Sequence, residues 1–359
     1  MLAILPAAAF FLSLAIFVSL ARPRRLPQAS ASARAISIVI PARNEEDTLA
    51  RLLDSLAPQA TSPLEIIVVD DQSEDGTARV ARDFGARVIS GQPLPEGWRG
   101  KTWACQQGAE AATGDWLLFL DADLTFLPDG LARLAACTST DAVHSVCPHH
   151  RVEKPYEELS AFFNAITLAG IDAFAVTPSR EATLFGQVLL IRKDHYQKAG
   201  GHEAVRGEIL ENYRFARLLR DHDLTIQHYL GKETIEMRMF PGGLAQLMES
   251  WRKGFVAGAA HSPGRALLTT SLWLTGGMIL TGCLGAAPFF GPLFAACTLT
   301  ASLGYALLTF WVFRLAGNFS FLTALLFPVP LLFYQGLFFK SLIDQKRGRQ
   351  TTWKGRSLS

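Results

Sequence analysis

Cysteine is scarce in this 359-residue sequence, with five copies scattered along the chain. The sequence contains no C-x-x-C pair, so it predicts neither a zinc site nor a disulfide framework, and reduced cytoplasmic thiols are the simplest interpretation. An excess of one charge is also missing, because 34 basic and 32 acidic side chains leave a formal net charge of +2. Bulk electrostatics therefore does not suggest a nucleic-acid partner.

Charged side chains are absent from three long stretches: Leu2 to Ala21, Ala266 to Phe313, and Leu315 to Phe339. A helix needs about 20 mostly apolar residues to cross a bilayer. We therefore expect a membrane protein with an N-terminal transmembrane anchor in residues 1–25. Up to three further transmembrane helices fit in residues 266–340.

Basic residues predict how the chain is oriented in the membrane. Arg22, Arg24 and Arg25 follow the first apolar stretch, whose front end has no Lys or Arg, which favours an anchor over a signal peptide cleaved near residues 31–33. Because positive charge stays on the cytoplasmic side, the region that follows should be cytoplasmic, at the inner (cell) membrane. The basic tail, residues 341–359, also favours the cytoplasm, although three further crossings would place it outside. One C-terminal segment of this multi-pass protein is therefore expected to be re-entrant or interfacial.

Residues 34–240 alternate short apolar runs with helical stretches. The runs "AISIVI", "LEIIVVDD", "ARVIS" and "DWLLFLDAD" are typical of strands, and "RNEEDTLARLLDSLA", "TARVARDFG" and "TWACQQGAEAA" of helices. Continuous apolar strands separated by helices predict an α/β domain with a mostly parallel sheet covered on both faces. In such sheets ligands bind beyond the carboxyl ends of the strands.

Three polar clusters follow predicted strands and should converge at that edge. Residues 41–45 follow the first strand, Asp70-Asp71 the second, and Asp121-Ala122-Asp123 the fourth. A second D-x-D, Asp221-His222-Asp223, follows a helical stretch instead, and we interpret it as a solvated loop.

The segments "SIVIPARNEEDTLARLLDSL", "EIIVVDDQSEDGT" and "GDWLLFLDAD" resemble the nucleotide-binding half of family-2 glycosyltransferases with the Rossmann-like GT-A fold. The segments "LPEGWRGKTWACQQGA", "FGQVLLIRKDHYQKAGGHEAVRGEILEN", "FPGGLAQLMESWRKGFVAGA" and "WKGR" resemble the membrane-bound diaponeurosporenoate glycosyltransferases, and in part the hopanoid-associated ones. The resemblance implies a hexosyltransferase that uses a nucleotide sugar.

By this resemblance, the aspartates after the fourth strand hold a divalent metal ion. Asp123 would bind Mg²⁺ or Mn²⁺, and Asp121 would bind the ribose or the metal. A bridging cation stabilises the charge that grows on the diphosphate leaving group, and both metals prefer oxygen ligands. The alternative for the tripeptide alone is an ordinary turn at a strand end.

The resemblance also assigns donor binding to the loops after the first two strands. Asp70 and Asp71 would contact the uracil base, although the turn formers that follow them also fit a plain loop. Four residues after the first strand would frame the nucleoside: Pro41, Ala42, Arg43 and Glu45. For Glu45 the alternative is an ordinary helix N-terminus, where an acidic side chain is favoured by the helix dipole. Lys101, at a predicted helix start, would face phosphate, and the alternative is an exposed lysine in a loop.

On the acceptor side, the chain departs from the family pattern. Many family-2 enzymes have a Glu-Asp pair whose Asp takes the acceptor proton, whereas this chain has Glu211-Asn212. An amide is not a useful base, so either Glu211 or Glu208 takes over, or the acceptor is already an anion. A carboxylic acid ionises with a pKa near about 4 and needs no base. The resemblance to carotenoid-acid enzymes implies this second case, with a glycosyl ester as product.

Residues 241–265 have apolar side chains at helical spacing with basic neighbours, which predicts an interfacial amphipathic helix. Trp251, Arg252 and Lys253 are its candidate acceptor or interface residues, with a simple membrane anchor as the alternative. The family signature Q-x-x-R-W corresponds to this region only loosely. The histidines at 149, 150, 195 and 202 show no ligand spacing, and we interpret them as surface or loop residues without an assigned role.

We therefore predict an inverting, metal-dependent transfer of a hexose to a membrane terpenoid lipid such as a carotenoid carboxylate. The expected donor is UDP-glucose. Inversion follows from direct attack by the acceptor, since no enzyme nucleophile is evident. The alternatives are a polyprenyl-phosphate sugar transferase and a non-catalytic membrane scaffold. A nucleotidyltransferase is disfavoured, because its glycine-rich phosphate loop is not visible.

Overall fold

The computed structural model describes residues 3–29, 35–59, 63–208, 210–251, 262–346, 352–353 and 356–357. The chain divides into two compact units. One unit, the sheet unit, contains Arg24–His149 and Thr183–Arg238; the other, the helical unit, contains Met1–Pro23, His150–Ala182 and Met239–Ser359.

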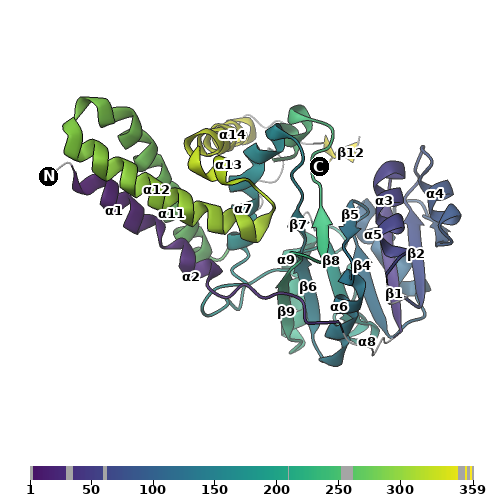
Figure 1. The fold of residues 1–359 in the computed structure, drawn as a ribbon. Coiled ribbons are helices and arrows are strands. Elements are labelled where there is room, and N and C mark those ends of the chain that lie inside the picture. Colours follow the sequence, from purple (N-terminus) through teal and green to yellow (C-terminus); the bar gives the residue numbers. More distant parts are fainter. Residues whose placement is uncertain are drawn as a thin grey trace. The chain divides into compact units, whose positions relative to one another are not determined.

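The sheet unit is built on seven strands in the order β3-β2-β1-β4-β8-β6-β9 (Figure 1). The strands, in chain order, are β1 (Ile36–Ala42), β2 (Glu65–Asp70), β3 (Arg87–Ser90), β4 (Trp116–Leu120), β6 (Val143–Cys147), β8 (Val188–Arg192) and β9 (Ile226–Leu230). The pairs among β3, β2, β1 and β4 are parallel, as is β6 with β9, whereas β8 runs antiparallel to both β4 and β6. The prediction of a mostly parallel α/β sheet is confirmed.

Short elements complete this unit. The helices are α3 (Glu46–Leu56), α4 (Thr77–Asp83), α5 (Gly100–Ala111), α6 (Gly130–Ala136), α8 (Lys193–Lys198) and α9 (Glu211–Asp221), with the 3-10 turns η1 (Cys137–Ser139) and η3 (His202–Val205). Strand β5 (Leu124–Phe126) pairs antiparallel with β10 (Ile235–Met237), and β7 (His149–His150) follows next in that small sheet.

Helices α5 and α9 share one hydrophobic core with the sheet. Val39, Val69 and Phe119 lie on the sheet side of this cluster, and Ala104 and Phe215 on the helix side, all nearly inaccessible to solvent. Burial of each large apolar side chain stabilises the fold by roughly 1.5–3 kcal/mol. Helix α5 lies close to the sheet because it contains Gly108, where an added Cβ would stand 2.3 Å from a methyl of Val39. This close packing fixes the start of α5, and with it Lys101, relative to the strand ends.

The helical unit contains α1 (Ile4–Ser13), α2 (Ile16–Leu20), η2 (Pro155–Ser160), α7 (Ala161–Gly170), a helix over residues 244–251, α11 (Gly264–Ala286), η4 (Ala287–Phe289), α12 (Gly291–Ala316), α13 (Phe321–Leu325) and α14 (Pro328–Lys346). The short strands β11 (Thr352–Trp353) and β12 (Arg356–Ser357) pair near the C-terminus. Within the described ranges, two helical segments are long and apolar enough to cross a membrane, Gly264–Phe289 and Gly291–Ala316. The N-terminal apolar helix, Ile4–Leu20, is shorter than the expected anchor.

Candidate active site

The loops after β1 and β2 are joined by hydrogen bonds at the carboxyl edge of the sheet. Asn44 and Gln72 adopt positive φ angles of 52° and 58°, which turns each chain sharply as it leaves its strand. The backbone N–H of Asn44 donates to Ser73 Oγ at 3.0 Å, and its Oδ1 accepts from the N–H of Glu74 at 2.8 Å. The two predicted clusters therefore form one continuous rim.

Asp70 and Asp71 contribute to this rim in different ways. Asp70 Oδ1 accepts the N–H of Ser73 at 3.1 Å, so its side chain closes the loop. The backbone N–H of Asp71 donates to the carbonyl of Ala42 at 2.8 Å. Arg43 donates to the Asp71 carbonyl at 3.2 Å, and one guanidinium nitrogen lies 3.8 Å from Asp71 Oδ2. Because both side chains are largely buried, this arrangement holds a guanidinium and a carboxylate in fixed positions next to the strand ends.

Strand β4 is followed directly by a carboxylate, Asp121, that pairs with the first turn of α5. Lys101 Nζ lies 2.5 Å from Asp121 Oδ1, and the N–H of Asp121 donates to the carbonyl of Gln187 at 3.0 Å. Burial alone would lower the pKa of Lys101, but the charges of Asp121 and Glu211 outweigh it and raise that pKa above its ordinary value. Lys101 is therefore a fixed positive charge at the edge of the sheet. Its predicted alternative, an exposed loop lysine, is wrong.

Asp123 lies in electrostatically unfavourable surroundings at this edge. Burial, together with the nearby charges of Asp121 and Glu45, raises the pKa of its carboxyl group, against the opposing charge of Lys101. Its Oδ1 atom is buried and has no hydrogen-bond partner in the described part of the chain. A buried carboxylate oxygen without a partner is costly, and a cation would remove that cost.

The carboxylates fit a divalent ion that shares its coordination with a substrate. No group of three His, Cys, Asp or Glu side chains among the described residues makes a ready-made metal cluster. Mg²⁺ and chemically similar ions commonly bind through one or two carboxylates and complete their shell with water and substrate phosphate. Asp121 and Asp123, with the orphaned Oδ1 of Asp123, match that donor set rather than a closed protein site.

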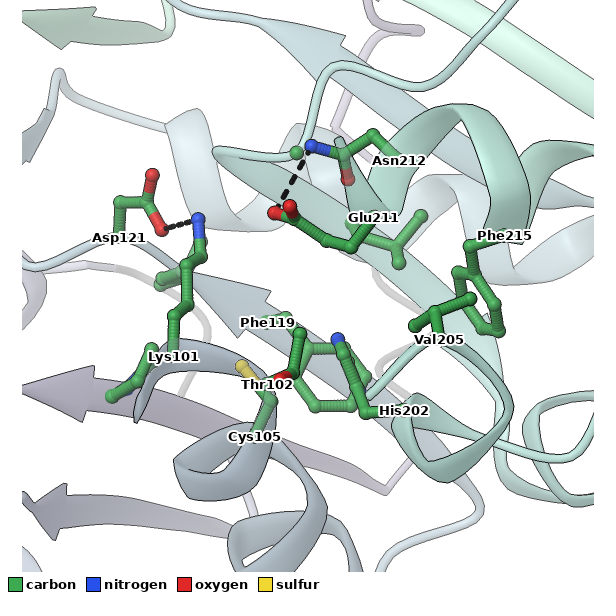
Figure 2. A pocket seen from close by; sticks show the side chains of 14 residues that line it. Lys101, Thr102, Cys105, Phe119, Asp121, His202, Val205, Glu211, Asn212 and Phe215 are labelled. Carbon is green, nitrogen blue, oxygen red and sulfur yellow. Dashed lines mark hydrogen bonds and ion pairs between the residues drawn. The ribbon is translucent and has the colours of Figure 1, made fainter. Parts of the chain in front are cut away.

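Helix α9 begins with the two residues that replace the family's usual acidic pair. Burial raises the pKa of Glu211, against the charge of Lys101. The amide of Asn212 donates from Nδ2 to Glu211 Oε1 at 3.4 Å, so the two side chains contact each other (Figure 2). Gly186 lies beneath Asn212, because a Cβ there would be 2.1 Å from Nδ2. Only a glycine leaves room for this amide.

One pocket brings these groups together within the sheet unit (Figure 2). Lys101 and Asp121 line one part of it, and Glu211 and Asn212 another, as the separate dashed contacts in the figure show. The other lining residues are Pro41, Thr102, Cys105, Phe119, Leu120, Gly186, Leu189, His202, Val205 and Phe215. Five predicted site residues therefore share this pocket. The other predicted residues of the sheet unit belong to the adjoining rim: Ala42, Arg43, Glu45, Asp70, Asp71 and Asp123.

The predicted acceptor residues of the helical unit have a different outcome. Trp251 is the last described residue of the helical segment 244–251, and its ring stacks on Phe163 at 4.7 Å between centroids and tilts against Phe240 at 5.9 Å. Arg252 and Lys253, like residues 347–351 of the basic tail, lie outside the described residues. The role predicted for this segment therefore stays a prediction.

Sequence reasoning missed the histidine that lines the pocket. His149, His150 and His202 are buried, so their interpretation as surface residues is wrong. His202 follows two glycines with positive φ, Gly200 at 83° and Gly201 at 58°, and that pair is the only sequence signal for an unusual backbone there. The second D-x-D behaves as predicted, because Asp221 and Asp223 are exposed at the turn between α9 and β9.

Comparisons with known proteins show the family and the fold of this chain. Residues 37–166 match the family described as Glycosyl transferase family 2. The 4,4'-diaponeurosporenoate glycosyltransferases of Staphylococcus aureus strains MRSA252 and USA300 are each 32% identical over 335 residues, which cover 91% of this chain and 88% of theirs. Among solved structures, a mannosyltransferase of Pyrobaculum calidifontis in complex with GDP-mannose and Mn²⁺ has a TM-score of 0.52 at 18% identity, covering 92% of this chain and 99% of that chain.

Proposed function

Because this chain belongs to glycosyltransferase family 2 and has the GT-A fold, it is a glycosyltransferase, and we propose that it transfers a hexose from a UDP-sugar to the carboxylate of a membrane terpenoid. A carotenoid acid is the proposed acceptor, and a glycosyl ester is the product. The observation that carries this proposal is Asn212, an uncharged amide at the start of α9 where many family-2 enzymes have an aspartate base. The names of the Staphylococcus aureus relatives, which refer to a carotenoid acid, support the same class of acceptor.

The rim after β1 and β2 would hold the nucleoside of the donor. Asp71 offers a carboxylate whose position is fixed by Arg43, and a carboxylate accepts the ring N–H of uracil. Lys101 would face the diphosphate, where its positive charge offsets the negative charge of the leaving group. Asp121 and Asp123 would hold a Mg²⁺ or Mn²⁺ ion, as the orphaned Asp123 Oδ1 supports. When bound, such an ion supplies Lewis-acid stabilisation of the diphosphate.

The transfer step needs no general base when the acceptor is a carboxylate. One carboxylate oxygen forms a bond to C1 of the hexose, while the bond from C1 to the diphosphate oxygen breaks and UDP leaves with the bonding electrons. No proton is released, because the acceptor is already ionised at neutral pH. A single displacement inverts the anomeric carbon.

Asn212 suits this acceptor for an electrostatic reason. An aspartate at this position would add a negative charge close to the incoming carboxylate and repel it. The amide is neutral, and its contact with Glu211 and its packing on Gly186 hold it in place. The site thus gives up the ability to deprotonate an alcohol through residue 212 and gains tolerance for an anion.

The proposed location is the cell membrane, with the sheet unit in the cytoplasm. The two long apolar segments, Gly264–Phe289 and Gly291–Ala316, support membrane association. Exposed Leu293, Leu299, Leu303 and Leu307 on α12 give the second segment an outer surface that suits lipid. A cytoplasmic sheet unit would have direct access to nucleotide sugars.

A paired-acceptor assay tests the proposed function. Membranes containing the protein receive UDP-glucose with a carotenoid acid or with its alcohol counterpart, and mass spectrometry identifies the lipid products. The expected product is an alkali-labile ester from the acid. Asn212→Asp should reduce transfer to the acid by about tenfold or more, since adding a nearby like charge costs more than about 1.4 kcal/mol at low dielectric. Asn212→Ala, which removes the amide without adding charge, is the matched control and should keep the preference for the acid.

Two results would contradict the proposal. Faster transfer to the alcohol by the unmodified enzyme would show that a base operates at the site. An acid-labile phosphodiester as the main product would instead identify a polyprenyl-phosphate acceptor.

A further inference from the structure

His202 lies in the pocket between two aromatic rings. Its imidazole contacts Phe119 edge-on, with 4.9 Å between centroids, and stacks on Phe215 at 5.6 Å. The residue is only 8% exposed, yet it lines the pocket with Lys101 and Glu211. Figure 2 shows a ring nitrogen of His202 directed toward the space that the Glu211 carboxylate also faces.

Hydrogen bonds behind the ring determine where its proton lies. Gln106 is oriented by its neighbours, because its Nε2 donates to Glu110 at 2.8 Å and its Oε1 accepts the N–H of Glu203 at 3.3 Å. The Tyr196 hydroxyl therefore donates its single proton to Gln106 Oε1, at 2.9 Å. The hydroxyl oxygen is then available only as an acceptor toward His202, whose Nδ1 lies 2.8 Å away. Nδ1 must carry the proton.

This assignment leaves Nε2 of His202 with a lone pair and no proton. In the part of the chain that the structure describes, Nε2 has no hydrogen-bond partner. The atom is also partly accessible, because the fully buried polar atoms without a partner do not include it. It is thus an acceptor that opens to the pocket. Burial, helped by the charge of Lys101, lowers the pKa of His202 to about 3, so the ring stays neutral at physiological pH and is a poor proton acceptor for catalysis.

The nucleoside of the proposed donor would lie on the rim after β1 and β2, so its uracil N–H and ribose hydroxyls would be used there, and the other parts of the substrates must be compared for this atom. The acceptor carboxylate and the diphosphate are anions without donor hydrogens, and a lone pair would repel both. The hexose, in contrast, has several hydroxyl groups and must lie between Lys101 on the diphosphate side and Asn212 on the acceptor side. The rings of Phe119 and Phe215 hold the imidazole in one orientation.

We propose that His202 Nε2 accepts a hydrogen bond from one hydroxyl group of the transferred hexose and so determines which hexose the enzyme uses. This inference rests on the proposed function, because it requires a sugar donor in the same pocket. Tyr196 acts as a positioning residue, since its hydroxyl fixes the tautomer that leaves Nε2 free to accept.

Deoxy-sugar donors test the inference. The hexose donor that the unmodified enzyme uses best is compared with its 2-, 3-, 4- and 6-deoxy analogues, each as the UDP-sugar, and kcat/KM is measured for the unmodified enzyme and for His202→Phe. We expect one analogue to lose about 10- to 100-fold in the unmodified enzyme, the usual range for an unmade hydrogen bond in a buried site. In His202→Phe, kcat/KM for that analogue should be about the same as for the parent hexose donor. The kcat/KM values of the other analogues, relative to the parent donor, should be the same as in the unmodified enzyme.

Additional variants separate recognition from simple damage to the fold. Binding of UDP with Mn²⁺ should be unchanged in His202→Phe, because UDP lacks the hexose. Tyr196→Phe keeps the imidazole but no longer fixes which ring nitrogen carries the proton. Its loss of discrimination against the same analogue should therefore be smaller than that of His202→Phe. Should His202→Phe fail to fold, His202→Gln replaces it: its amide oxygen can accept, and partial discrimination is expected.

The outcomes distinguish this inference from the proposed function. An active enzyme whose analogue ratios are the same with and without the His202 side chain would overturn the inference alone. The inference would also be overturned if removing the His202 side chain changed the discrimination between acid and alcohol acceptors but not the discrimination between donor hexoses. An unmodified enzyme that transfers no hexose at all would overturn the proposed function and this inference with it.

Discussion

The two halves of the sheet contribute to the pocket in different ways. In the half formed by β1 to β4, the strands are parallel, and polar residues follow directly after them. In the half formed by β8, β6 and β9, β8 is antiparallel to β6 whereas β6 and β9 are parallel, and apart from Leu189 on β8 the pocket residues come from a loop, a 3-10 turn and the first turns of a helix. A parallel sheet thus collects its ligands at one edge by topology alone, whereas the second half depends on specific packing.

This difference matches the division of labour that we propose. The first half would bind the parts of the donor that all nucleotide-sugar enzymes of this kind share. The second half contains Gly186, His202 and Asn212, which would determine the acceptor and the hexose. The following substitutions test this contrast.

The largest effect is expected from Asp123→Ala in the first half. Removing one of two carboxylates that would hold the metal should reduce kcat/KM on the order of 10³-fold, because the cation is worth several kcal/mol to the leaving group. The measurement is hexose transfer at saturating Mn²⁺. Asp223→Ala, in the exposed second D-x-D, is the matched control and should leave activity unchanged. Full activity of Asp123→Ala would remove the metal assignment.

A somewhat smaller effect is expected from Lys101→Met, which keeps the length of the side chain but removes its charge. Lys101 pairs with Asp121 at 2.5 Å and would face the diphosphate, so kcat/KM should fall on the order of 10²-fold, as for other lost transition-state contacts. Lys198→Met provides the control, since Lys198 is exposed and donates to the carbonyl of His222. Equal losses in both variants would argue against a role of Lys101 at the diphosphate.

Gly186→Ala probes the second half. Its new Cβ would approach within 2.1 Å of the Asn212 amide and displace it, and kcat/KM for the acid acceptor should fall about tenfold, since small misplacements at a reacting centre are costly. Binding of UDP should be unaffected, because the rim after β1 and β2 is intact. The control is Gly282→Ala in α11, where an added Cβ meets no atom within 4 Å. A loss of UDP binding in Gly186→Ala would show that the two halves are not separable.

The smallest effect concerns stability at acid pH. His228 Nε2 donates to the carbonyl of Thr183 at 2.7 Å, and burial lowers the pKa of His228 to about 4. Between the unfolded value of about 6.5 and pH 4, the unfolded chain binds a proton that the folded chain does not, so this residue reduces stability as the pH falls, by up to about 1.4 kcal/mol per pH unit. His228→Gln lacks this penalty.

The stability difference between His228→Gln and the unmodified protein should therefore narrow as the pH falls from 6.5 to 4.5, measured as denaturation midpoints at each pH. A constant difference for His228→Gln would mean that the folded and unfolded chains bind this proton equally, so that folding does not lower the pKa of His228.

Much of the first half could be predicted because its signals are local. The strand ending at Pro41 and the helix that buries Leu49 and Leu52 appear as β1 and α3, and Gly85 follows α4 with a φ of 76°. Each of these depends on a few neighbouring residues: an apolar run, a helical repeat, or a glycine in the left-handed region.

The second half could not be predicted in the same way. His202 is one of several histidines without ligand spacing. No nearby sequence pattern identifies Phe119, Phe215 or Tyr196 as its neighbours in the fold. Its burial and its tautomer follow from contacts between residues up to about a hundred positions apart, such as Tyr196 with Gln106. Long-range packing of this kind has no periodic signature in the sequence.

The sequence by itself determined that the chain alternates strands and helices, that acidic residues stand at strand ends, and that residue 212 cannot serve as a base. Those properties are fixed by side-chain chemistry and by short-range backbone preferences. The tertiary structure alone decided that Lys101 pairs with Asp121, that Gly186 makes room for Asn212, and that His202 presents a lone pair to the pocket. These outcomes require atoms from distant segments to meet within a few ångströms, which only the packed core brings about.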